Sequence, residues 1–235
     1  MVYSGDYNIK VHDILAELRA ANVEWAPTFA FVDPDGPNCH WSTLEALARH
    51  KPSTSKSKVE MWILFPTMFM RQLPLRAAGP RPEHKHQIDL MFGNDQWELI
   101  YKARRRGELE GGEARDEYVN LMRWRIEQSL GYDATHAIDI PNEQGRPIYT
   151  MIFATDHEAG DRIMASVYRK IAAEFPLMRI QAAEIAARKR GDRVQTNLFA
   201  EDPAANAEHL PVGNYYWEAP RDPPGTAYGP DGEYL

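Results

Sequence analysis

The chain has 235 residues, of which 43% are hydrophobic and 26% are charged, and it contains one cysteine. This length and composition suffice for one substantial globular domain followed by a tail. The lone Cys39 excludes an internal disulfide framework and a zinc site made of cysteines alone. The formal net charge of −7 excludes a generally basic surface of the kind that coats nucleic acid, although it permits a local basic groove.

The first residues lack a basic segment followed by an apolar run, so we expect no signal peptide. No uninterrupted apolar stretch of about 18 residues occurs, and we therefore expect no membrane span. Together with the cysteine usage, these features predict a reducing, cytoplasmic location.

The first half of the chain predicts alternating helices and strands. Apolar residues on one face of residues 11–21 predict a helix. Continuous apolar runs at 28–32 and 59–65 predict strands that are buried on both faces, as in a parallel sheet. Between them, Ser42 and Glu45 have the spacing of a capping box and predict the start of another helix. The prolines of residues 72–83 predict a loop.

The second half predicts a long helix, a hairpin and two more helices. Apolar periodicity predicts a helix that ends at Gly131. Apolar runs at 134–140 and 147–154 flank a short turn and predict an antiparallel hairpin. Asp156 has the residue type of a helix cap and predicts a helix over 157–175, followed by another to residue 189.

This order of elements predicts an α/β fold with a partial Rossmann, methyltransferase-like sheet that is mostly parallel. The terminal hairpin would add an antiparallel edge strand, and helices would cover both faces. We assign residues 1–190 to this domain and the proline-rich residues 191–235 to an extended tail. The predicted elements form only the second half of such a sheet, because no glycine-rich cofactor loop precedes them.

Half a sheet has a physical consequence for the strand near Phe29. Its outer edge would be open and apolar, and such edges pair readily with other chains. We therefore predict a homo-oligomer, a covering segment from the tail, or a companion chain.

The segment Asp33-Pro34-Asp35-Gly36 directly follows the first predicted strand. Ligands of open α/β sheets bind at the carboxyl ends of the strands. Two carboxylates in a loop stiffened by Pro34 are suited to accept hydrogen bonds from an amine, and Gly36 permits positive φ or close backbone approach. The same residue types also build plain turns, and this alternative stays open.

Several segments, in their order and spacing, resemble the three-Cys-motif partner family. The resemblance runs from residue 3 to about residue 175. Members of this family resemble Rossmann-type, S-adenosylmethionine-dependent methyltransferases, and their name records an association with a protein that bears a three-cysteine motif. The segments that carry the resemblance are Gly5-Asp6-Tyr7-Asn8, Phe29-Ala30-Phe31-Val32-Asp33-Pro34-Asp35-Gly36, Trp41-Ser42-Thr43-Leu44, Ile63-Leu64-Phe65-Pro66 with Arg71, Phe92-Gly93-Asn94-Asp95-Gln96-Trp97 and Tyr149-Thr150-Met151-Ile152-Phe153-Ala154-Thr155-Asp156-His157.

The resemblance implies a cofactor site and an acceptor site. Asp6, with Tyr7 and Asn8, occupies the place of the residues that meet the adenine end of S-adenosylmethionine, and Asp33 that of the residue that accepts from the amine being methylated. A three-cysteine-motif protein is the implied partner. From residue type alone, Asp6 is equally suited to cap a helix.

Two departures from the family pattern bear on activity. The glycine-rich segment that would cradle the cofactor does not occur, and Asp35 replaces an aromatic residue that would stack on a target base. We therefore favour a degenerate binding or partner module linked to nucleic-acid or mobile-element biology. The alternative is an active base amino-methyltransferase, completed by a missing N-terminal segment or by a second chain.

A basic run offers a candidate nucleic-acid contact and consists of Lys102, Arg104, Arg105 and Arg106. Such residues track a phosphate backbone when they gather in one groove, and otherwise they form a solvated surface. His84 and His86, in a predicted loop, lack two further ligands at zinc spacing, so no metal site is expected. Cys39 is more simply an inert thiol than a nucleophile.

The predicted tail contains a motif, formed by Gln195, Leu198 and Phe199, that resembles the peptide with which bacterial proteins bind the DNA sliding clamp. An extended segment with two apolar anchors is suited to dock in a groove. A replication-associated interaction protein is therefore the third hypothesis.

Overall fold

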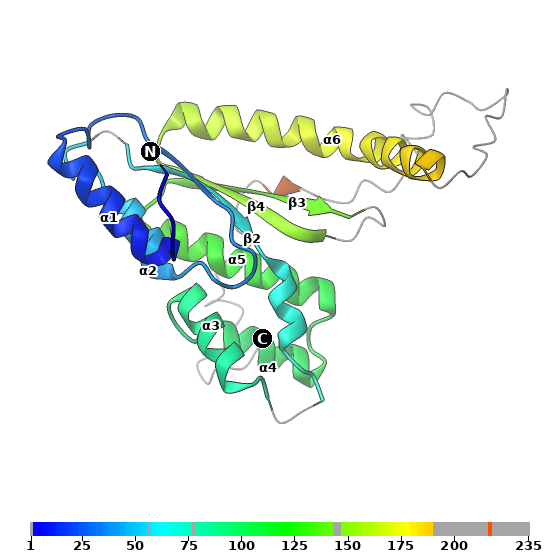
Figure 1. Cartoon of the computed structure of the whole chain (residues 1–235). Coiled ribbons are helices and arrows are strands. Elements are labelled where there is room, and N and C mark those ends of the chain that lie inside the picture. Colours follow the sequence, from blue (N-terminus) through cyan, green and yellow to red (C-terminus); the bar gives the residue numbers. More distant parts are fainter. Residues whose placement is uncertain (1, 56, 77–78, 143–146, 190–215, 218–235) are drawn as a thin grey trace, which may run out of the picture.

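The structure is a computed structural model of the whole chain, and it describes residues 2–55, 57–76, 79–142, 147–189 and 216–217 (Figure 1). The described residues form one mixed α/β arrangement. Its elements in chain order are α1 Tyr7–Ala20, β1 Phe29–Val32, α2 Trp41–Ala48, β2 Glu60–Phe65, the 3-10 helix η1 Thr67–Gln72, α3 Pro82–Phe92, α4 Trp97–Arg106, α5 Gly111–Leu130, β3 Ala134–Pro141, β4 Pro147–Thr155, α6 Glu158–Lys189 and β5 Tyr216–Trp217.

The strands lie in the order β1-β2-β4-β3-β5. β1 and β2 are parallel, and α2 lies between them in the chain as the crossover. β4 is antiparallel to both of its neighbours, β2 and β3. It follows that β1, β2 and β3 share one direction and that β4 alone, among these four strands, runs the opposite way.

The mixed α/β class and the antiparallel hairpin are confirmed, whereas two details of the predicted sheet are wrong. Only the β1–β2 pairing is parallel. β4 lies inside the sheet rather than at its edge, because it returns between β2 and β3. A single strand inserted in this way turns two neighbour contacts antiparallel, so a sheet with three co-directional strands is no longer mostly parallel.

Helices cover both faces of the sheet, as expected. Figure 1 shows α6 along one face and α5 against the other. The larger core lies on the α5 face and joins Met61, Ile63 and Ile152 to apolar residues of α2, α3, α4 and α5. The smaller core lies under α6 and includes Ile138, Phe153 and Tyr168. Alternate strand residues therefore enter different cores, as the two-residue period of a strand requires.

Two helices begin differently from what the sequence predicted. α3 begins with Pro82 in its first turn, so residues predicted as the end of a loop, with His84 and His86, are helical. Proline is compatible with this position because its missing N–H has no helical acceptor there. In α2 the N-cap is His40, and no side chain caps it, so the predicted capping box of Ser42 and Glu45 is wrong.

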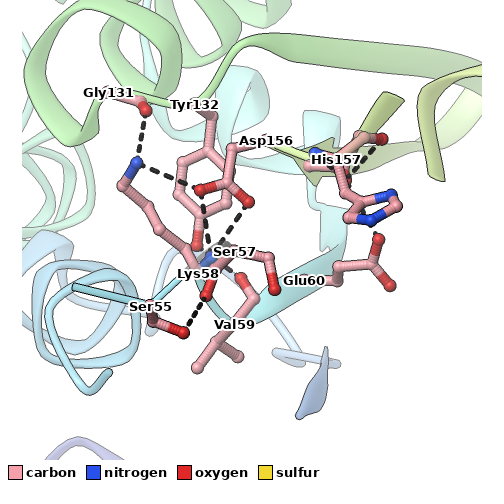
Figure 2. Close-up of polar contacts among 10 residues, drawn as sticks. Ser55, Ser57, Lys58, Val59, Glu60, Gly131, Tyr132, Asp156 and His157 are labelled. Carbon is pink, nitrogen blue, oxygen red and sulfur yellow. Dashed lines mark hydrogen bonds and ion pairs between the residues drawn. The ribbon is translucent and has the colours of Figure 1, made fainter. Parts of the chain in front are cut away.

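Asp156 joins two strand ends instead of capping α6 (Figure 2). Its carboxylate accepts from the backbone N–H of Lys58 at 2.9 Å and from the Lys58 ammonium at 3.3 Å. The same ammonium donates to the Gly131 carbonyl at 2.6 Å, while the Tyr132 hydroxyl donates to the Val59 carbonyl at 2.5 Å. The helix start is served instead by His157, whose Nδ1 accepts from the Ala159 N–H at 3.1 Å.

α6 continues past residue 176, so the two helices predicted for this region are one. Most of the predicted tail lies outside the described residues. The part that is described, Tyr216–Trp217, pairs with Ile138 and Ala137 of β3. This segment therefore covers the edge of the sheet at β3, opposite to the edge formed by β1. Within the described residues, no helix has the length and apolar character that a membrane crossing needs.

Candidate functional site

β1 has a free edge, because β2 is its one neighbour among the described strands. The Glu60 N–H donates to the Thr28 carbonyl at 3.0 Å, and Phe29 is in register with Glu60. In a parallel ladder alternate residues turn their backbone groups to the same neighbour, so Thr28 and Ala30 face β2. The N–H and C=O groups of Phe29 and Phe31 consequently point away from the sheet.

The side chains of Phe29 and Phe31 are also uncovered. They are 52% and 54% exposed, and both meet the ring of Trp62 edge-on at about 6 Å. The prediction that this strand is buried on both faces is therefore wrong, because only Val32 is buried and Ala30 packs against the larger core. The edge itself is open and apolar, as expected for half a sheet.

A cleft of about 410 Å³ runs beside this edge. One wall comes from the N-terminal segment and α1, including Tyr3, Tyr7 and Val11, and the other from β1 and the residue that follows it. Phe31 and Asp33 line the second wall. The cleft thus places an apolar strand edge and a carboxylate in one concave surface.

In the Asp33-Pro34-Asp35-Gly36 loop, the two carboxylates differ in state. Asp35 accepts a hydrogen bond from the Asn38 amide at 2.5 Å. Asp33 is exposed, lines the cleft, and makes no hydrogen bond or ion pair with another described residue. Gly36 does not have a positive φ, so that part of its predicted role is wrong, and an added Cβ would meet only Asn38 at 3.8 Å. Asp33 is the residue of this loop that is free to bind a ligand.

Asp6 caps α1, which was the alternative to a cofactor contact. Its carboxylate accepts from the backbone N–H of Asn8 at 2.9 Å. The amide of Asn8 is fully used as well: it donates to the Asn38 carbonyl at 2.9 Å, and its oxygen accepts from the His40 N–H and the Thr43 hydroxyl at 2.9 and 2.8 Å. Asn8 therefore ties α1 to the loop before α2.

Tyr7 and Cys39 form a neutral pair behind the cleft. Cys39 is buried, and burial raises the pKa of its thiol to about 12, with a hydrogen bond from Tyr7 as the opposing effect. Burial likewise raises the pKa of Tyr7, and the neighbouring thiol adds to this. A thiol that remains protonated at neutral pH is a poor nucleophile. The interpretation of Cys39 as an inert, buried thiol is consistent with these surroundings.

Arg104 lies apart from the other three residues of the basic run, which share one face of α4. Lys102 pairs with Glu98 at 3.1 Å, Arg106 pairs with Glu108 at 2.6 Å, and Arg105 lies over the ring of Tyr101 at 5.7 Å. Arg104 turns the other way and donates to the Gly111 carbonyl at 3.3 Å. The helical period separates neighbours by about 100°, which a linear sequence does not display.

His84 and His86 lie on α3, and the described residues contain no cluster of three or more potential metal ligands. Gln195, Leu198 and Phe199 lie outside the described residues. The contacts that sequence reasoning missed are long-range ones, such as the Asn8 bonds to His40 and Thr43. No local signal announces them, because an asparagine near a helix start is ordinarily a capping residue.

Comparison of the chain with protein-family models, with curated proteins and with solved structures found no match.

Proposed function

We propose that this chain is a methyltransferase-like α/β module that works as a partner-binding protein. In this proposal a companion protein chain inserts an extended, apolar segment into the cleft and pairs it with the free edge of β1. The observation that carries the proposal is the outward-facing backbone of Phe29 and Phe31 beside a cleft of about 410 Å³. Strand addition of this kind supplies main-chain hydrogen bonds along the whole contact.

The strand order supports the methyltransferase-like part of this proposal. In the doubly wound order 3-2-1-4-5-6, the last three strands continue outward, in parallel, from the central one. β1, β2 and β3 repeat that order and direction, with β4 inserted between the second and third. In this correspondence the outer edge of β1 is the edge that the remainder of such a sheet would cover.

The partner-binding role is tested by the mass of the protein in solution. In the absence of its partner, the free edge should pair with another copy, so the light-scattering mass should rise with concentration above 26.9 kDa. Phe31→Lys places a charge at the edge and should return the mass to that of the monomer. Ile163→Lys is the matched control, because Ile163 is similarly exposed, at 60%, but lies on α6.

The two variants also distinguish association through the β1 edge from nonspecific association through exposed apolar side chains. Equal masses for Phe31→Lys and Ile163→Lys would contradict the proposal. Slow hydrogen exchange at the Phe29 and Phe31 amides of a monomer would contradict it too, since those amides would then already be protected.

A second candidate function is amine methylation. The Asp33 carboxylate at the carboxyl end of β1, which has no partner among the described residues, favours it. In this reading a second chain supplies the glycine-rich loop that holds the methyl end of S-adenosylmethionine. Asp33 would then accept a hydrogen bond from the acceptor amine and orient its lone pair toward the methyl group. Asp6 would contribute little to the cofactor, because its carboxylate is already occupied in the cap of α1.

Calorimetry with S-adenosylmethionine separates the two candidates. We expect no heat of binding for this chain alone, because no glycine-rich loop, whose backbone N–H groups would cradle the methionine end, occurs before β1 in this sequence. Micromolar binding by the chain alone would contradict the degenerate-module proposal and would favour an active enzyme.

A three-cysteine-motif protein and the sliding clamp are the two other proposed partners. A three-cysteine-motif protein is one candidate for the companion chain, and it follows from the family resemblance alone. Docking on the sliding clamp would use Leu198 and Phe199, and a Leu198→Ala/Phe199→Ala variant should then lose clamp binding in a pull-down.

A further inference from the structure

Three arginines from three different elements converge on a second cavity, which we call the arginine pocket. It has a volume of about 340 Å³ and is lined by Arg71 of η1, Arg104 of α4 and Arg115 of α5. Thr67, just beyond β2, and Pro147, at the start of β4, also line it. The pocket therefore lies at the carboxyl ends of β2 and β3, where open α/β sheets bind ligands. No residue lines both this pocket and the cleft beside β1.

The positive charge in the pocket is only partly compensated. Arg115 pairs with Asp116 and, at 3.1 Å, with the buried Asp139. Arg104 donates to the neutral Gly111 carbonyl, which offsets no charge. Arg71 is exposed and makes no ion pair or hydrogen bond through its side chain within the part of the chain that the structure describes. Two guanidinium groups that line the pocket thus have no carboxylate partner among the described residues, in a protein whose formal net charge is −7.

Asp139 fixes the position of the third arginine. Burial raises the pKa of its carboxyl group, and the charge of Arg115 together with a hydrogen bond from Thr150 opposes that rise. The Thr150 hydroxyl donates to Asp139 at 2.6 Å, so the carboxylate is held between the sheet and α5. Nε and Nη2 of the Arg115 guanidinium are consequently engaged by Asp116 and Asp139, which hold the group in one orientation at the pocket wall.

We propose that the arginine pocket binds the phosphate group of a nucleotide unit. Guanidinium groups match phosphate oxygens with paired N–H donors, and several of them are needed to balance a phosphate's charge. A ligand carboxylate carries a single negative charge, so it would leave one of the two guanidinium groups without a counter-charge. Met70 and Ile148 form an apolar wall on which a sugar or base can rest.

The test is fluorescence anisotropy with a labelled oligothymidylate of about 12 nucleotides, a length that spans an ordinary single-strand site. Loss of a charge-assisted hydrogen bond should weaken binding of Arg71→Gln and Arg104→Gln by about tenfold each. Each substitution should also reduce the slope of log K against log salt by about 0.7, because one phosphate contact is lost. Arg162→Gln, on α6 and outside the pocket, is the matched control and should bind as the wild type does.

Two further probes identify the source of the phosphate. Adenosine monophosphate that displaces the oligonucleotide, with a dependence on Arg71, indicates a free nucleotide ligand. Displacement by neither adenosine monophosphate nor inorganic phosphate indicates the phosphodiester backbone of a nucleic acid. The proposal is overturned if Arg71→Gln and Arg162→Gln bind alike, or if none of the three probes binds. Thermal melting of each variant shows whether the fold is retained, and the exposure of Arg71 leads us to expect an unchanged melting temperature.

Phosphate binding at the arginine pocket does not depend on strand addition at β1. Loss of oligonucleotide binding in Arg71→Gln leaves the light-scattering mass unchanged if the two sites are separate, whereas Phe31→Lys should change the mass and not the anisotropy.

Discussion

Asn8 and Asp33 lie on the same side of the fold, yet one polar side chain is fully used and the other is free. The Asn8 amide serves the cap of α1, the Asn38 carbonyl, the His40 N–H and the Thr43 hydroxyl. Asp33 has no such partner among the described residues and faces the cleft. A ligand that bound the Asn8 amide would break these hydrogen bonds and would have to replace them. Asp33 can accept a hydrogen bond from a ligand without losing one to another described residue.

His50, which follows α2, is buried in a position where its protonation should affect stability. It is 2% exposed, and its Nδ1 has no hydrogen-bond partner among the described residues. Burial lowers the pKa of the imidazole below its ordinary value of 6.5, and the charges of Arg19 and Lys51 lower it further. Protonation is then easier in the unfolded chain, so His50 contributes stability above pH 6.5 that is lost as the pH falls toward its folded pKa.

An NMR titration of the His50 ring protons checks this sign, with the His50→Gln spectrum as the assignment control. The midpoint should lie below 6.5. The free energy of unfolding should fall more steeply between pH 7 and pH 5 in the wild type than in His50→Gln. A midpoint above the ordinary value would mean that Glu24, which opposes the shift, is the dominant neighbour.

At the scale of elements, the packing of α3 against α2 depends on one glycine. Gly93 ends α3 with a φ of 68°, the left-handed conformation that favours glycine. A Cβ at this position would lie 2.6 Å from the ring of Trp41, the first residue of α2. Trp41 itself is buried beneath the Arg125 guanidinium, which lies 4.1 Å from the ring centroid. The indole cannot give way without disturbing a packed core.

Gly93→Ala should therefore destabilise the protein by about 2–5 kcal/mol, the sum of left-handed strain and overpacking. Gly112→Ala is the matched control. It replaces a glycine in the first turn of α5 where no atom lies within 4 Å of the new Cβ, and it should be neutral or stabilising by up to about 1 kcal/mol. Urea denaturation measures both, and equal midpoints would contradict the account of Gly93.

The element boundaries show where local rules compete with tertiary contacts. An aspartate before a helix ordinarily caps it, yet the Asp156 carboxylate binds the backbone and ammonium of Lys58 instead (Figure 2). The ion pair joins segments 98 residues apart in the chain. A charge-assisted contact of this kind outweighs a cap that His157 is able to supply.

At the scale of the whole molecule, the two faces of the sheet are covered unequally (Figure 1). The α5 face is closed by a single large core. On the opposite face, α6 covers β3 and β4. It also contacts β2 through Trp62, whose indole N–H donates to the Tyr168 hydroxyl of α6 at 2.5 Å. Phe29 and Phe31, one strand farther out, stay more than half exposed. The exposed aromatic pair and the free edge consequently belong to one continuous surface.

Local sequence patterns were sufficient for the helix of α1, the strands β1 to β4 and the turn that begins at Asp33. These features depend on neighbours within a few residues, through helical and strand periodicity and through turn chemistry. They were insufficient for the insertion of β4 between β2 and β3, the partner of Asp156 and the full use of the Asn8 amide. Arg71, Arg104 and Arg115 likewise gave no sign that they meet, because they lie on different elements whose relative placement is decided by core packing. The sequence by itself determined most local elements, the acidic strand end and the open edge expected at the strand near Phe29. The tertiary structure alone decided the cleft beside that edge and the arginine pocket, since both bring together residues that are distant in the chain.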